Sequence, residues 1–154
     1  MSKILVTGST GNVGSRLVQR LVELGQSVRA FTRKGDKSSF APSVEVVEGD
    51  YTDIESLRRA MAGVSKMYLL SAGHDLPAHE ANAIGAAKEA GVEHVVKHSV
   101  AGAQWKALEL GRWHRAGEER LEASGLNWTF LRPAAFDTNA FGWIQTVKAQ
   151  GTVY

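Results

Sequence analysis

The sequence of 154 residues contains no cysteine, which excludes a disulfide framework and any thiolate chemistry. It has no stretch approaching the ~18 consecutive apolar residues of a membrane span. Its N-terminal segment is also too poor in apolar residues for a secretory signal, which needs an apolar region of about 7–15 residues. We therefore expect a protein of a reducing compartment, by default the cytoplasm, with no membrane partner.

An excess of charge of one sign is missing as well. The 18 Lys and Arg residues oppose 16 Asp and Glu residues, and no basic run is longer than Arg58-Arg59. A nucleic-acid partner is therefore not expected. The hydrophobic fraction of 44% and the charged fraction of 22% are ordinary for globular proteins. This length and composition predict one domain over residues 1–154, with a core of its own.

Short apolar runs alternate along the chain with segments of helical periodicity. Strands are expected at residues 4–6, 28–32, 44–47, 67–70, 94–99 and 128–131. Helices are expected at residues 13–24, 54–62, 78–90 and 108–123. This alternation is typical of the α/β class, and it predicts a doubly wound parallel sheet of the Rossmann type. Ligands of such a sheet bind at the carboxyl ends of its strands.

Three glycines follow the first strand at G-x-x-G-x-x-G spacing, in the segment Thr7-Gly8-Ser9-Thr10-Gly11-Asn12-Val13-Gly14. In a strand-turn-helix context, this spacing indicates a dinucleotide site. Gly8 would permit the tight turn, Gly11 the approach of a pyrophosphate, and Gly14 the close packing of the helix. Free N–H groups at the helix start would hold the phosphates. The alternative is a plain glycine-rich turn. The residues predicted to bind the cofactor here are Thr7, Gly8, Thr10, Gly11, Asn12, Val13 and Gly14.

The end of the second strand distinguishes the two nicotinamide cofactors. An acidic residue there would bind the ribose 2′-hydroxyl of NAD, but the sequence reads Phe31-Thr32-Arg33-Lys34. The guanidinium of Arg33 suits the 2′-phosphate of NADP. We therefore expect NADP(H) as the cofactor in preference to NAD(H). The alternative is that Arg33 and Lys34 are only solvated surface cations, since Asp36 lies a little further along.

Two further strand ends should reach the same crevice. Asp50 and Tyr51 follow the third strand, and the Asp50 carboxylate could accept a hydrogen bond from the adenine amino group. Its alternative role is to cap the next helix, for which Thr52 and Asp53 are better placed. The segment Leu70-Ser71-Ala72-Gly73 closes the fourth strand. Its small residues would let a ribose or a nicotinamide approach, or they form a simple turn.

With these residues in view, the sequence resembles the NmrA-like branch of the atypical short-chain dehydrogenase/reductase superfamily. That branch includes NAD(P)H:quinone reductases of the triphenylmethane-reductase type. The resemblance rests on the glycine loop, on residues 49–53, on His98-Ser99, on residues 114–118 and on residues 124–133. It covers essentially the whole chain. It implies a Rossmann lobe that binds NADP, and either reduction of quinone-like or dye-like aromatic substrates or a redox-sensing role.

Members of this branch usually continue into a smaller C-terminal lobe that shapes the substrate pocket. The resemblance therefore implies that residues 1–154 form the cofactor lobe, either as a natural short form or as a fragment. It also implies that the substrate lobe is absent from this chain.

The proton shuttle of mainstream short-chain dehydrogenases is absent, because none of the three tyrosines is followed four residues later by a lysine. Alcohol oxidation and sugar epimerisation are therefore not expected. Hydride transfer to a quinone asks less of the protein, because the cofactor carries the hydride. The five histidines suggest no metal site, since His94 and His98 lie about 13 Å apart along one strand.

Two residues are the nearest candidates for proton donation, Ser99 at the fifth strand end and His114 on the following helix. The alternative for Ser99 is a capping or ribose-binding hydroxyl, and for His114 a role in packing. Two functions thus stay open, an NADPH-dependent oxidoreductase acting on a quinone-like or aromatic acceptor, and a non-catalytic NADP(H)-binding redox sensor. The missing tyrosine and lysine pair favours the sensor, whereas residues 114–133 favour the enzyme.

A last segment, from Ala140 to Gln150, is predicted to be a helix with Phe141, Ile144 and Val147 on one stripe. Trp143 lies beside them. Exposed apolar stripes of this kind tend to be buried by a partner. A homodimer is the simplest assembly that would cover the stripe.

Overall fold

The structure, a computed structural model, describes residues 2–34, 37–105 and 108–153. Its strands are β1 (Lys3–Val6), β2 (Ser27–Thr32), β3 (Glu45–Glu48), β4 (Val64–Leu69), β5 (His94–His98) and β6 (Asn127–Leu131). Its α-helices are α1 (Asn12–Glu23), α2 (Ile54–Met61), α3 (Leu76–Glu89), α4 (Glu109–Glu122) and α5 (Ile144–Gln150). Two 3-10 segments, η1 (Ala103–Trp105) and η2 (Asp137–Trp143), complete the described elements.

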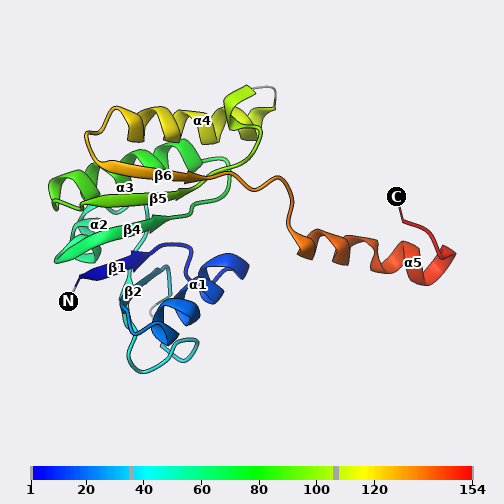
Figure 1. The fold of residues 1–154 in the computed structure, drawn as a ribbon, viewed down its shortest axis with the longest axis horizontal. Coiled ribbons are helices and arrows are strands. Elements are labelled where there is room, and N and C mark those ends of the chain that lie inside the picture. The colour runs from blue at the N-terminus through cyan, green and yellow to red at the C-terminus, as the bar shows by residue number, and fades with distance from the viewer. Residues whose placement is uncertain (1, 35–36, 106–107, 154) are drawn as a thin grey trace.

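The strands form one six-stranded parallel sheet in the order β3-β2-β1-β4-β5-β6 (Figure 1). The chain starts in the middle of the sheet, winds outward to β3, and then returns to build the other half. This order confirms the predicted doubly wound Rossmann fold, and it creates a crevice where the winding reverses, between β1 and β4.

Two apolar layers hold the helices against the sheet. One core includes Leu57 of α2, Ala83 of α3 and Leu121 of α4, all fully buried. The other includes Val18 of α1, packed with residues of β1 and β2. Thus α1 covers one face of the sheet, and α2, α3 and α4 cover the other (Figure 1).

The predicted strands and the first four helices are all present, with small shifts at their ends. Gly25 follows α1 with φ 71°, and the N–H groups of Gly25 and Gln26 bind the carbonyls of Val22 and Leu21. A glycine with positive φ directly after the last turn is a common way for a helix to end. Helix α3 begins at Leu76, two residues before the predicted start, with a proline in its first turn, a position that proline tolerates.

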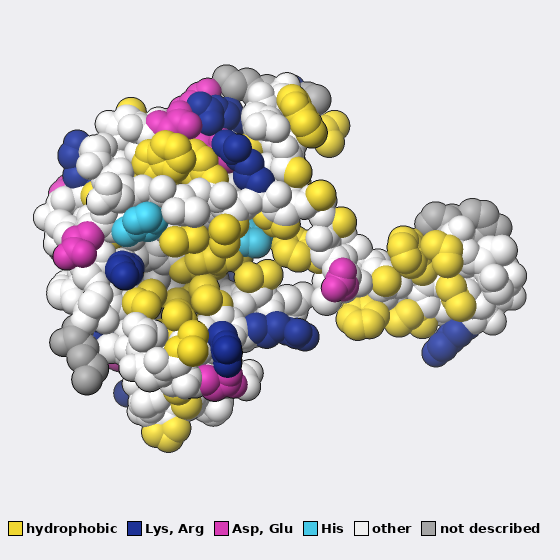
Figure 2. Space-filling view, in the orientation of Figure 1, with side chains coloured by type: hydrophobic (Ala, Val, Ile, Leu, Met, Phe, Trp, Pro, Cys, Tyr) yellow, Lys and Arg dark blue, Asp and Glu magenta, His cyan; other side chains and the backbone are white. Residues whose placement is uncertain are grey.

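The predicted terminal helix is only partly correct. Residues 144–150 are α-helical, but the preceding residues form the 3-10 segment η2. Asn139 and Gly142, which favour an α-helix weakly, lie in that segment. The expected apolar side chains are exposed, with 69% of Phe141 and 43% of Trp143 accessible. Figure 2 shows hydrophobic side chains gathered on this segment, which extends away from the sheet. None of the described helices is long and apolar enough to cross a lipid bilayer.

Candidate functional site

The turn between β1 and α1 is shaped by two glycines that the protein's own packing requires. Gly8 has φ 61°, and a Cβ atom there would lie 2.5 Å from Leu70 Cδ2. A Cβ atom on Gly14 would lie 2.1 Å from the carbonyl oxygen of Gly8. Any side chain at Gly14 would therefore push α1 away from the turn. These two glycines bring the helix start close to the end of β1.

Gly11 is different, because no contact among the described residues requires a glycine there. Its φ is −80°, which any residue adopts, and a Cβ atom would meet only the Gly8 carbonyl oxygen, at 3.4 Å. As the N-cap residue of α1, Gly11 brings no side chain to the helix start, and the first turn holds no acidic residue. The helix start therefore keeps free N–H groups and room for an anion beside it.

The carboxyl ends of β1 to β4 enclose a cleft of about 810 Å³. The predicted residues that line it are Gly8, Thr10, Gly11, Arg33, Asp50, Tyr51, Leu70, Ser71 and Ala72. Further lining residues are Phe31, Thr32, Lys34, Ser39, Gly49 and His79. Sequence reasoning singled out neither Ser39 nor His79, because neither lies in a recognisable motif. Strand order alone brings these distant segments to one opening.

Four of the predicted cofactor-binding residues lie outside the lining. Asn12, Val13 and Gly14 form the first turn of α1. Thr7 is fully buried, and its hydroxyl donates to the Tyr68 carbonyl at 3.0 Å while it accepts from the Leu70 N–H at 2.8 Å. Thr7 therefore joins β1 to β4 beneath the cleft. Asp36, the carboxylate weighed against Arg33, lies outside the described residues.

Asp50 stands at the exposed rim of the cleft. One oxygen of its carboxylate accepts from the Thr52 N–H at 2.9 Å and from the Thr52 hydroxyl at 2.7 Å. These bonds lower the pKa of Asp50, with smaller contributions from His79 and Arg33. Asp53 is the N-cap of α2, because its side chain accepts from the Ser56 N–H. Asp50 is thus not the helix cap, and it is charged at neutral pH.

Tyr51 and His79 form an aromatic wall of the cleft. Their rings stack with centroids 5.1 Å apart and planes inclined by 15°. The Tyr51 hydroxyl donates to the Leu70 carbonyl at 2.7 Å, and burial raises the pKa of this phenol. Tyr51 therefore stays neutral and fixed, which makes it a rigid surface against which a flat group can pack.

The predicted catalytic Ser99 is buried under α4. Its hydroxyl donates to Glu118 Oε1 at 2.6 Å, and Glu118 also accepts from Arg132 at 2.8 and 2.9 Å and from Arg115 at 3.0 Å. Burial acts to raise the pKa of Glu118, but the bonds from Arg132, Ser99 and Arg115 lower it to about 2. The Ser99 hydroxyl is therefore bound to a carboxylate that is ionised at neutral pH, and it does not line the cleft.

The second predicted catalytic residue, His114, lies next to a buried charge that was not predicted from the sequence. Its Nδ1 atom lies 3.3 Å from Nζ of Lys97, a fully buried residue of β5 that is paired with the fully buried Glu80 of α3. Burial, followed by the nearby Lys97, lowers the pKa of His114 to about 4. The one signal for Lys97 in the sequence was a lysine inside a strand of a predicted parallel sheet, since the strands of such sheets are usually buried on both faces.

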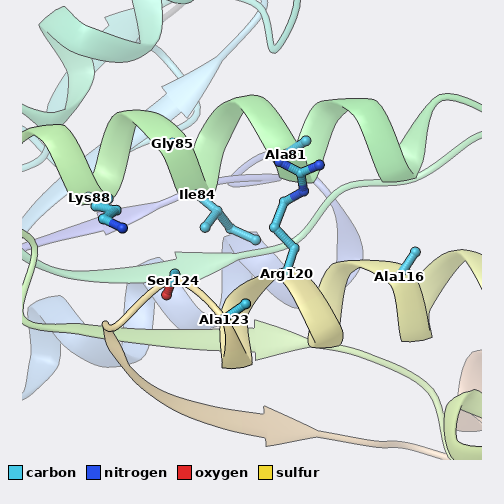
Figure 3. Close-up of a pocket in the computed structure, with 8 residues that line it drawn as sticks. All are labelled: Ala81, Ile84, Gly85, Lys88, Ala116, Arg120, Ala123 and Ser124. Atoms are coloured by element: carbon cyan, nitrogen blue, oxygen red, sulfur yellow. The ribbon is translucent and has the colours of Figure 1, made fainter.

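A second hollow, of about 500 Å³, lies between α3 and α4 (Figure 3). Small residues from both helices line it, and Lys88 and Arg120 stand on facing helices. None of the glycine-loop residues reaches it. Small side chains on the two facing helices leave this space open, and its described lining contains no carboxylate, histidine or cysteine.

The geometry of the glycine turn and of its cleft agrees with comparisons to known proteins. A family described as NAD(P)H-binding matches residues 8–153. The chain belongs to this family. A (4-alkanoyl-5-oxo-2,5-dihydrofuran-3-yl)methyl phosphate reductase from Streptomyces griseus is 37% identical over 97% of the chain and 54% of that protein.

Solved structures lead to the same group. A triphenylmethane reductase from Citrobacter sp., complexed with NADP(H), is 32% identical with a TM-score of 0.85, over 98% of this chain and 55% of that one. An NADPH-dependent quinone oxidoreductase from Escherichia coli, complexed with NADPH, is 28% identical with a TM-score of 0.88, over 96% and 54%. The resemblance to NmrA-like short-chain dehydrogenase/reductases is confirmed. The chain spans about half the length of these relatives.

Proposed function

We propose that the protein is an NADPH-dependent oxidoreductase that transfers a hydride to a quinone-like or other aromatic acceptor. The observation that carries the proposal is the uncapped start of α1 beside Gly11, where the protein leaves space that its own packing does not need. A pyrophosphate fits that space, because it is an anion that binds backbone N–H groups. When bound, the cofactor supplies the hydride.

The residues of the cleft would hold the rest of this cofactor. Arg33 and Lys34 line the cleft and are exposed, so they can reach a 2′-phosphate, and Arg33 can bind it with two parallel hydrogen bonds. The stacked rings of Tyr51 and His79 offer a flat surface. Support for NADPH over NADH also comes from the similar triphenylmethane reductase and quinone oxidoreductase structures, which hold NADP(H) and NADPH.

Two relatives support the proposed class of acceptor, a quinone oxidoreductase and a reductase of triphenylmethane dyes. Both kinds of acceptor are conjugated and electron-poor. For such acceptors, catalysis consists largely of holding the donor and the acceptor together. This suits a chain without the tyrosine and lysine pair.

The test is NADPH binding and quinone reduction by the Gly11→Val protein. A valine there would occupy the proposed pyrophosphate space, so NADPH binding should weaken at least about 100-fold, and turnover should vanish. Gly85→Val is the matched control, because Gly85 also has an ordinary φ and open space, but lies on α3. Titration calorimetry measures the first effect, and NADPH oxidation with a panel of quinones the second. Unchanged binding in Gly11→Val would contradict the proposal.

One observation favours the alternative function, a redox sensor that binds NADP(H) without turnover. The hydroxyl of Ser99, which was predicted to be catalytic, is bound to Glu118 and does not line the described cleft. Tight NADPH binding without reduction of any acceptor would support the sensor.

We also propose a homodimer, supported by the exposed Phe141 and Trp143. A cytoplasmic location stays a prediction.

A further inference from the structure

A complete ion pair lies buried beneath the cleft. Neither Lys97 of β5 nor Glu80 of α3 exposes any surface, and they contact each other directly. A buried ion pair is seldom the most stable choice, because apolar residues of similar volume often stabilise a protein equally or better. Its presence in this core therefore suggests a role other than stability.

The helix that covers the pair is adapted to it. A Cβ atom on Gly117 of α4 would lie 1.7 Å from Glu80 Oε2 and 3.1 Å from Lys97 Cε. Only glycine lets α4 approach with the carboxylate in this position. The same Oε2 atom is buried and accepts no hydrogen bond from any described residue. The ion pair thus lies between β5, α3 and α4, in a space that is open because Gly117 has no side chain.

The ion pair contacts the cleft wall on one side and His114 on the other. On one side, the Ser71 hydroxyl, in the cleft wall, donates to Glu80 Oε1 at 3.4 Å. On the other side, Lys97 Nζ lies 3.3 Å from His114 Nδ1. Glu118 of α4 and His98, the next residue of β5, are the other titratable groups that act on Lys97 or His114. Among the described residues, Lys97 is thus the cation that contacts both Glu80 and His114.

We propose that Lys97 supplies the proton for the reduced acceptor and that His114 relays it. This rests on the proposed reductase function. The ammonium of Lys97 donates to Nδ1, so the neutral ring of His114 carries its proton on Nε2. The sequence showed no tyrosine and lysine pair, but the fold brings a lysine of the fifth strand to a histidine of the next helix. Burial lowers the pKa of Lys97, which eases the loss of its proton.

The proton transfers balance in two coupled steps. A quinone that has accepted a hydride is a hydroquinone monoanion, and its oxygen takes the proton from His114 Nε2. The ring then gains a proton at Nδ1 from Lys97, which becomes a neutral amine beside Glu80. A proton from solvent later returns along the same path in reverse, through Nε2, and the ring recovers its first tautomer. The net change is one proton moved to the acceptor oxygen.

This relay predicts a dependence on the charge of the acceptor. A neutral quinone becomes an anion when it accepts a hydride, so it needs a proton. A cationic triphenylmethane dye becomes neutral when it accepts a hydride, so it needs none. Loss of the relay should therefore slow quinone reduction and leave dye reduction unchanged. A structural defect would slow both reactions equally.

The experiment compares His114→Asn with the paired variant Lys97→Met/Glu80→Gln, which removes both buried charges together. His94→Gln is the control, because His94 lies at the other end of β5. Loss of a general acid typically costs about 100-fold or more, so kcat for a benzoquinone should fall on the order of 100-fold in both relay variants. Rates with a cationic triphenylmethane dye should change less than about twofold. Equal losses on both acceptors, or no loss on the quinone, would overturn the relay.

A second readout needs neither cofactor nor turnover. Nitrogen-15 NMR of the imidazole ring should show His114 as a neutral ring with its proton on Nε2 between pH 5 and 8. In Lys97→Met/Glu80→Gln, the ring should become a mixture of tautomers. A ring with its proton on Nδ1 in the unmutated protein would refute the assignment. If the unmutated protein reduces neither acceptor, the proposed function fails and the catalytic relay fails with it. In that case, the NMR result still shows whether Lys97 sets the tautomer.

Discussion

At the end of β2, the cation of Arg33 stands where an NAD-binding protein of this fold would place a carboxylate. Arg33 is exposed, lines the cleft and lowers the pKa of Asp50 by its charge. A guanidinium in this position can pair with a 2′-phosphate, but it gains little from a 2′-hydroxyl.

Replacement of Arg33 by alanine should therefore remove the preference for NADP(H). Hydrogen bonds to charged groups contribute about 1.5–3 kcal/mol, so the unmutated protein should bind NADPH about tenfold or more tightly than NADH. Arg33→Ala should bind both equally, as measured by titration calorimetry. Arg20→Ala, an exposed arginine at the other end of α1, is the control and should keep the preference. Equal affinities in the unmutated protein would refute the NADPH assignment.

The close contact between the turn after β1 and the first turn of α1 depends on Gly14. A methyl group on Gly14 would lie 2.1 Å from a backbone oxygen, and a backbone atom cannot turn aside as a flexible side chain can. A Cβ atom on Gly85 of α3 would have no neighbour within 4 Å in the part of the chain that the structure describes.

Gly14→Ala should destabilise the fold by about 1–3 kcal/mol, because α1 must move to admit the methyl group. Gly85→Ala should instead stabilise it by about 0.5–1 kcal/mol, since alanine favours a helix more than glycine does. Urea denaturation followed by circular dichroism measures both effects. Equal effects of the two substitutions would show that the close approach at Gly14 does not constrain the helix.

Most of the elements could be predicted, because their signals are local. Apolar runs marked the strands, and helical periodicity ended by Gly25 marked α1. The predicted helix from Ala140 to Gln150 was wrong between Ala140 and Trp143, since the 3-10 form there is decided by a few weak preferences rather than by a periodic core contact. Of the candidate site, the glycine loop and the strand-end residues were found, but His79 and the Lys97 and Glu80 pair were not. These residues meet only through contacts between separate elements.

At the scale of the whole molecule, the exposed apolar side chains of η2 and α5 form a surface that we expect a partner to bury. Phe141, Trp143, Ile144 and Val147 each expose more than two fifths of their surface. A second copy of the chain that used the same face would shield them in a symmetric contact.

Multi-angle light scattering should therefore show a homodimer that weakens on dilution. The double variant Phe141→Ser/Trp143→Ser should be monomeric, because it removes the two largest apolar groups of the segment. Leu24→Ser, at an exposed leucine distant from this segment along the chain, is the control and should remain dimeric. A monomer at every concentration of the unmutated protein would contradict the homodimer.

The sequence by itself determined the doubly wound sheet, the glycine loop and the cation at the end of β2, because each depends on residue types at short spacing. Only the tertiary structure decided which side chains meet beneath the cleft. Ser99 and Glu118 are 19 residues apart and Lys97 and Glu80 are 17 apart, and crossovers between parallel strands bring them together. Periodicity reports whether a position is buried, but the partner of a buried charge depends on how the helices pack.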